Sequence, residues 1–149
     1  MEHGAGNKEE VLKRACKYGH QTIVKYSVEH GADVKGNEYA LTKACENEHE
    51  TIVKLLVENG ADIQQALIKA CYYRQETIVK CLVEHGAEVQ GNKDALNWAC
   101  TNRNETIVKY LVEHGAKVQG NEEALNYACE KGQETIVKYL IEHRSSTGK

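Results

Sequence analysis

The sequence predicts an all-α solenoid of stacked helix-turn-helix repeats. The tetrapeptide Thr-Ile-Val-Lys occurs five times at intervals of 29, 26, 29 and 29 residues, beginning at Thr22, Thr51, Thr77, Thr106 and Thr135. An Ala-Cys pair and a Gly recur in the same register. Self-similarity at a fixed period of this length is typical of solenoids, in which each unit buries its apolar face on its neighbours.

The first helix of each repeat is predicted around the Ala-Cys pair. In the fourth repeat the apolar residues at helical spacing are Ala95, Leu96, Ala99 and Cys100. This spacing gives one apolar stripe rather than the alternation of a strand. Asn92 is the expected N-cap, and Asp94 places negative charge in the first turn, where the helix dipole favours it.

The second helix is predicted from the Thr-Ile-Val-Lys segment. Its apolar stripe in the fourth repeat consists of Ile107, Val108, Leu111 and Val112. Glycine ends this helix in the first four repeats, at Gly31, Gly60, Gly86 and Gly115. Each helix has only about ten residues, fewer than the roughly 12–15 that an isolated helix needs, so stacking must stabilise it.

The repeats fill the chain as one array without a linker. We expect the array at residues 9–143, with units 9–39, 40–65, 66–94, 95–123 and 124–143, between tails at 1–8 and 144–149. No repeat follows Ile136, Val137, Leu140 and Ile141, so we expect exposed apolar surface at this end. The expected state is a monomer with weak end-to-end association.

Composition indicates a cytoplasmic protein in a reducing compartment, with the nucleus left open. No apolar run approaches the roughly 20 residues that span a bilayer, and the amino terminus lacks a signal-peptide core. Five of the six cysteines recur at one repeat position, at Cys16, Cys45, Cys71, Cys100 and Cys129. Adjacent repeats place them about 8–10 Å apart, too far for a disulfide, so we expect small buried thiols. A bridge between Cys71 and Cys81 is the less favoured alternative.

The segment Leu-Val-Glu-His-Gly-Ala-Glu-Val at 82–89 and its equivalents closely resemble ankyrin repeats. The resemblance covers nearly the whole chain as five units, whereas tetratricopeptide repeats have a different period and motif. The chain departs from the ankyrin pattern because its period is mostly 29 residues and it contains no proline. The missing residues lie between repeats, where the family has β-hairpin fingers, so we expect these fingers to be shortened or absent.

No pattern indicates an enzyme, a cofactor or a metal site. One histidine per repeat, at His30, His85, His114 and His143, cannot converge on a single zinc ion. These rings are instead expected to interact with the last carbonyls of their helices. The chain has no phosphate-binding loop and no nucleophile elbow.

The resemblance implies a scaffold that binds a protein partner on a concave face formed by the first helices. The candidate residues vary between repeats while their neighbours stay fixed: Arg14, Tyr18, Lys43, Asn47, Lys69, Tyr72, Tyr73, Trp98, Asn102 and Tyr127. Aromatic residues and arginine often dominate interface energies, and the central Tyr72, Tyr73 and Trp98 are the favoured core of this site.

Two other interpretations remain at this point. The first is recognition of a nucleotide or single-stranded nucleic acid by aromatic rings and the basic residues Arg14, Lys43, Lys69, Arg74 and Arg103. A net charge of -3 makes nucleic-acid binding the weaker hypothesis. The second is a duplicated array that has no partner of its own.

Overall fold

A computed structural model describes residues 3–144 of the chain, with side chains from Lys8 onward, and this part contains ten α-helices and no strand. The helices are α1 (His3–Tyr18), α2 (Gln21–Glu29), α3 (Glu38–Glu46), α4 (Glu50–Glu58), α5 (Ile63–Tyr72), α6 (Glu76–Glu84), α7 (Lys93–Thr101), α8 (Glu105–Glu113), α9 (Glu122–Glu130) and α10 (Glu134–Glu142). None of the ten is both long enough and apolar enough to cross a membrane.

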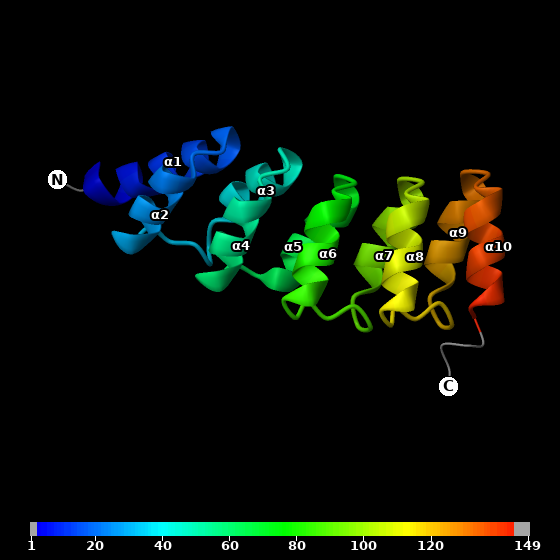
Figure 1. Ribbon diagram of the computed structural model, residues 1–149. Helices are drawn as coiled ribbons and strands as arrows, with labels where there is room; N and C mark the ends of the chain where they lie inside the picture. The colour runs from blue at the N-terminus through cyan, green and yellow to red at the C-terminus, as the bar shows by residue number, and fades with distance from the viewer. Residues whose placement is uncertain (1–2, 145–149) are drawn as a thin grey trace.

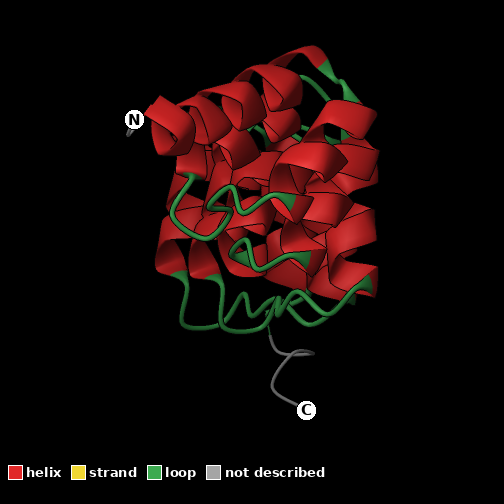
Figure 2. Cartoon of the chain, turned by 90° about the vertical axis from the view of Figure 1, so that its left-hand side faces the viewer, coloured by secondary structure: helices red, strands yellow, loops and turns green. Residues whose placement is uncertain are grey.

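Consecutive helices pair into five antiparallel units that stack side by side (Figure 1). The odd-numbered helices form one layer and the even-numbered helices the other (Figure 1). The loops between repeats gather along one side of the stack (Figure 2). The all-α solenoid predicted from the repeat period is therefore confirmed. The connections between repeats contain no strand within residues 3–144, as expected for shortened or absent fingers.

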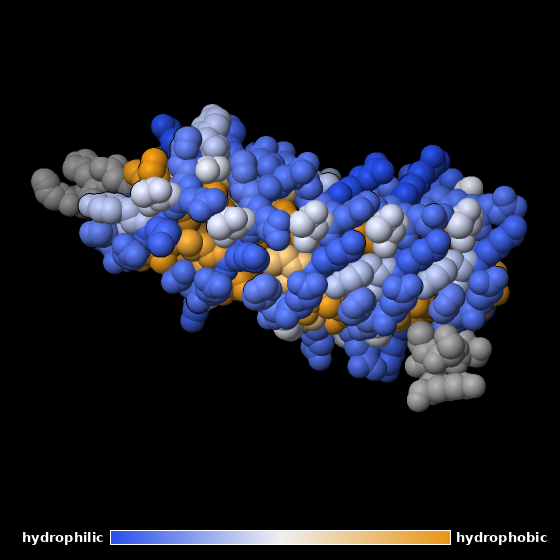
Figure 3. Space-filling view, in the orientation of Figure 1, coloured by the Kyte–Doolittle hydropathy of each residue, from blue (hydrophilic) through white to orange (hydrophobic). Residues whose placement is uncertain are grey.

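The first helices approach one another more closely than the second helices do. The reason is side-chain size, because the first helices bury alanine where the second helices bury larger residues. Ala66 and Ala70 of α5 are fully buried, whereas α6 buries Ile78 and Leu82. Each repeat is therefore narrower on its first-helix side, and the stack curves toward that side. The second-helix face, which is turned to the viewer in Figure 3, is covered mainly by hydrophilic side chains.

The ends of the second helices and the start of α7 agree with the sequence prediction. Gly31, Gly60, Gly86 and Gly115 follow the second helices with φ between 94° and 109°, a left-handed conformation in which glycine has no steric penalty. The side chain of Asn92 accepts a hydrogen bond from the backbone N–H of Ala95. One difference concerns the first repeat, where α1 begins at His3 and so includes most of the segment 1–8.

The turn inside each repeat also needs a left-handed residue, which the sequence did not reveal. Glycine occupies it in the first and last repeats, at Gly19 and Gly132. Residues with a side chain occupy it in the other three, at Glu48, Arg74 and Arg103, with φ of 61°, 62° and 59°. These three positions hold backbone strain, because a Cβ crowds the neighbouring carbonyl in this region.

The prediction of buried thiols is correct for four of the five cysteines of the row and wrong for Cys129. Cys16, Cys45, Cys71, Cys81 and Cys100 are buried free thiols, so the alternative of a Cys71–Cys81 bridge is not realised. The Sγ atom of Cys45 lies 4.0 Å from the Ala66 carbonyl of the next repeat. Cys129 is exposed because no further first helix packs beside α9 among the residues that the structure describes.

The apolar surface expected at the end of the array is smaller than predicted. Ile136 and Leu140 are buried because they pack inward on the preceding helices, whereas no described residue packs on the outer side of α10. On that side Val137 is half-buried, and Ile141 is 52% exposed.

Candidate partner-binding surface

Three aromatic side chains predicted as the core of the site form one cluster on the first-helix layer. The ring of Tyr72 lies edge-on to Trp98, with centroids 4.7 Å apart, and edge-on to Tyr73 at 4.8 Å. Tyr72 and Trp98 are both exposed although they contact each other. The cluster bridges the third and fourth repeats, and its edge-to-face geometry is favourable for aromatic pairs.

A hollow of about 340 Å³ continues the surface from this cluster to the last repeat. It lies between α7 and α9 and is lined by Asp94, Asn97, Trp98, Thr101, Glu123 and Tyr127. Trp98 therefore belongs to both features. Tyr127, the last predicted site residue, is half-buried here.

A second hollow of about 480 Å³ lies at the other end of the layer and has a different lining. Its residues are Glu10, Lys13, Arg14, Lys17, Tyr18 and Tyr39. The ammonium groups of Lys13 and Lys43 lie 5.5 Å and 5.4 Å from the centroid of the Tyr39 ring, within cation–π range. The first-helix layer is thus basic and aromatic at its amino-terminal end. Tyr39 is a member of this surface that sequence reasoning missed.

Two of the predicted basic residues, Arg14 and Lys43, form local ion pairs. Arg14 pairs with Glu10 at 3.1 Å on the exposed face of α1. Lys43 pairs with Glu46 at 3.2 Å, and this hydrogen bond raises the pKa of Lys43. Lys69 is half-buried on α5.

Tyr73 lies close to the Lys43–Glu46 ion pair and links the basic end of the layer to the aromatic cluster. Burial is the first cause that raises the pKa of its hydroxyl, and the negative charge of Glu46 adds to it. The phenol therefore stays protonated at neutral pH and can donate a hydrogen bond.

The two predicted asparagines already serve the structure. The amide of Asn47 donates to the Lys43 carbonyl at 2.9 Å and caps the end of α3. The amide of Asn102 donates to the Tyr72 carbonyl of the preceding repeat at 2.7 Å. These donors are occupied, so the surface open to a partner consists mainly of the aromatic and charged side chains.

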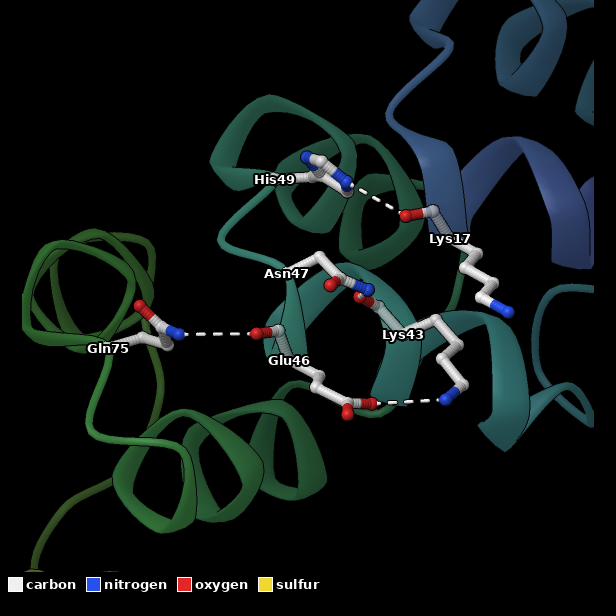
Figure 4. A network of polar contacts seen from close by, with 6 residues as sticks. All are labelled: Lys17, Lys43, Glu46, Asn47, His49 and Gln75. Atoms are coloured by element: carbon white, nitrogen blue, oxygen red, sulfur yellow. Dashed lines mark hydrogen bonds and ion pairs between the residues drawn. The ribbon is translucent and has the colours of Figure 1, made fainter.

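A series of side-chain hydrogen bonds joins successive repeats just behind this surface. His49 donates from Nε2 to the Lys17 carbonyl at 3.1 Å, and Gln75 donates from Nε2 to the Glu46 carbonyl at 3.4 Å (Figure 4). Gln133 reaches the Cys100 carbonyl at 2.6 Å. His49, Gln75 and Gln133 hold one repeat position, which is always polar in the sequence, and that regularity was the signal that sequence reasoning left unused. These bonds fix the spacing of the first helices and so position the surface.

A different side chain replaces the missing finger between the third and fourth repeats. Gln64 donates from Nε2 to the Glu88 carbonyl at 2.8 Å, and its Oε1 accepts from the Glu88 N–H at 2.6 Å. One amide side chain thus forms the pair of hydrogen bonds that two backbone segments would form in a ladder.

The histidine row interacts with helix carbonyls as predicted. The Nδ1 atoms of His30, His85, His114 and His143 each lie 2.8 Å from the carbonyl oxygen four residues earlier. Within residues 8–144, whose side chains the structure describes, no group of three potential ligands is placed to hold a metal ion.

Comparison with protein families gives a match. A family model described as ankyrin repeats (3 copies) matches residues 1–66 and again residues 62–122. A search of curated proteins found no match for this chain.

Proposed function

Because the chain belongs to the ankyrin repeat family, whose repeats generally act as protein–protein interaction modules, we propose that it is a non-enzymatic scaffold that binds a protein partner. The partner would contact the concave layer of first helices. A solenoid offers an extended surface of this kind, because each repeat adds one segment to the same face.

The observation that carries this proposal is the aromatic cluster of Tyr72, Tyr73 and Trp98, in which Tyr72 and Trp98 are exposed and Tyr73 is half-buried. Large aromatic side chains are the most frequent sources of interface energy, and they usually lie near the centre of an interface. This cluster lies on the third and fourth of five repeats. The inter-repeat hydrogen bonds of His49 and Gln75 hold the surrounding helices in place, so little conformational entropy is lost when a partner binds.

A protein partner is favoured over a nucleic acid by the charges around the cluster. Asp94 and Glu123 line the hollow next to Trp98, and Glu46 lies beside Tyr73. Carboxylates at these places would repel a phosphate backbone from the rings on which bases would have to stack.

We further propose that the protein works as a monomer in a reducing compartment such as the cytoplasm. This location would keep all six thiols free, including the exposed Cys129. Sedimentation of the purified chain at rising concentration would test the monomer.

Affinity capture from cells of the source organism, followed by binding of the purified partner, tests the proposed function. The triple variant Tyr72→Ala, Tyr73→Ala, Trp98→Ala should lose binding by about a hundredfold or more, because each central aromatic residue is worth about 1–2 kcal/mol or more in a typical interface. The far-UV circular dichroism should remain that of the parent, since Tyr72 and Trp98 are exposed and Tyr73 is half-buried at the end of α5.

Tyr26→Ala is the matched control, because Tyr26 is an exposed tyrosine on α2 in the opposite layer. This variant should bind like the parent. Unchanged binding of the folded triple variant would refute the proposed surface. Loss of binding in Tyr26→Ala alone would move the interface to the second helices.

A further inference from the structure

We propose that the hollow between α7 and α9 receives an arginine side chain of the partner. The inference rests on the proposed function, since it names the group that the first-helix surface recognises. The lining combines two carboxylates, two aromatic rings and an amide oxygen, and these are the groups that a guanidinium uses.

The first argument is a buried acceptor without a partner. Asn97 is only 8% exposed, and its Nδ2 atom donates to Glu123 at 2.9 Å. Its Oδ1 atom, which is shielded from bulk solvent, accepts no hydrogen bond from the residues that the structure describes. Such an atom is costly unless it is satisfied, so a donor that enters the hollow would gain a hydrogen bond that the free protein lacks.

The second argument is charge. Asp94 and Glu123 stand in the first turns of α7 and α9, on the two sides of the hollow. Lys93, the cation next to Asp94, donates instead to the Gly120 carbonyl at 3.4 Å. The lining itself therefore contains two negative side chains and no positive one.

The third argument is shape. Trp98 and Tyr127 contribute aromatic rings, and a guanidinium is planar and weakly hydrated, so it stacks on such rings while its five N–H groups remain free to donate. The hollow at the amino-terminal end is a useful contrast. It also has tyrosines, but it is lined by Lys13, Arg14 and Lys17 and would repel the same group.

Trp98 provides a direct readout because it is the only tryptophan in the chain. The probe is the capped tripeptide acetyl-Gly-Arg-Gly-amide, added to the full chain while the indole N–H signal is followed by NMR. We expect a saturable shift with a dissociation constant on the order of 1 mM, as is reasonable for one side chain. The same tripeptide with citrulline, which has the shape of arginine but no charge, should cause no saturable shift.

Two variants test the charge with a matched pair. Glu123→Gln removes a lining carboxylate but keeps an oxygen that can accept from Asn97. It should lower the affinity for the arginine peptide by about tenfold or abolish its binding. Glu122→Gln makes the same change one residue away on α9, where the carboxylate lies 3.6 Å from Arg144, and it should leave binding within about twofold of the parent.

The proposal is overturned if citrulline binds as well as arginine, if neither peptide shifts the indole signal, or if the two variants behave alike. These results are separate from the test of the proposed function. Partner binding that is lost in the triple alanine variant but kept in Glu123→Gln would preserve the interface and reject the arginine site.

Discussion

Replacing Arg74 by glycine should stabilise the protein. Arg74 lies in the turn between α5 and α6 with φ of 62°, the conformation that Gly19 and Gly132 adopt in the equivalent turns. Among the described residues, its side chain makes no hydrogen bond or ion pair, so little is lost when it is removed. Arg103 is less suitable because its guanidinium donates to the Lys131 carbonyl at 3.1 Å.

The magnitude follows from two opposing terms. A residue with a Cβ in the left-handed region costs about 1–2 kcal/mol relative to the right-handed one. Glycine offsets part of this gain because it loses about 0.5–1 kcal/mol more conformational free energy on folding. We therefore expect a net gain of about 0.5–1 kcal/mol, which raises the melting temperature by about 1–4 °C in a chain of this size.

The assay is urea unfolding followed by far-UV circular dichroism, with Arg74→Ala as the reference. Alanine removes the same side chain but keeps the Cβ, so the difference between the two variants isolates the backbone term. A glycine variant that is no more stable than the alanine variant would refute the argument from strain.

The reverse change has a built-in comparison. Gly132→Ala should destabilise the protein by about 1 kcal/mol, because a Cβ there meets nothing within 4 Å and only the backbone term applies. A Cβ on Gly19 would lie 2.7 Å from Cε1 of His49, whose ring is tied to Lys17. Gly19→Ala should therefore cost more than Gly132→Ala, and equal costs would contradict the placement of the His49 ring.

Three further predictions concern the loop, the thiols and the core. Gln64→Ala should destabilise the protein by about 1–2 kcal/mol in urea unfolding, because two hydrogen bonds to Glu88 are lost, whereas Gln65→Ala should have a smaller effect. A thiol reagent should modify only Cys129 in the native protein. Because burial raises the pKa of three other thiols, those of Cys16, Cys45 and Cys100, to about 12, these groups should remain protonated and unmodified from pH 7 to pH 9, and modification of a second thiol would contradict this. Leu96→Ala should cost about 2–5 kcal/mol, and a loss below 1 kcal/mol would show that the site is not close-packed.

Local chemistry made much of the fold predictable. Glycine at the end of each second helix and Asn92 at the start of α7 have mechanisms that act within a few residues. The repeat period then fixed which helices are neighbours. The repeat also made the exposure of Tyr72 and Trp98 predictable, since a position that varies within a constant repeat points away from the core.

The remaining features depend on distances between repeats, which no single repeat encodes. His49 and Gln75 look like ordinary surface residues until the preceding helix end is placed within reach of their side chains. Gln64 has glutamine equivalents at Gln90 and Gln119, but it lies in α5 whereas they lie in turns, and its amide reaches the backbone of Glu88. Cys129 follows an alanine as the buried cysteines of the row do, but among the described residues no next repeat packs on it.

The last repeat of the described stack has a neighbour on one side only, and this asymmetry bears on the energetics of any ligand held at that end. Helices α9 and α10 should open locally more often than the central repeats, because no described repeat packs on the outer side of α10, where Val137 is half-buried and Ile141 is exposed. A ligand bound by residues of both α7 and α9 would fasten the terminal unit to the rest. Its measured affinity would then include the free energy needed to close that unit. Slower amide hydrogen exchange in α10, which the ligand does not contact, would reveal the coupling.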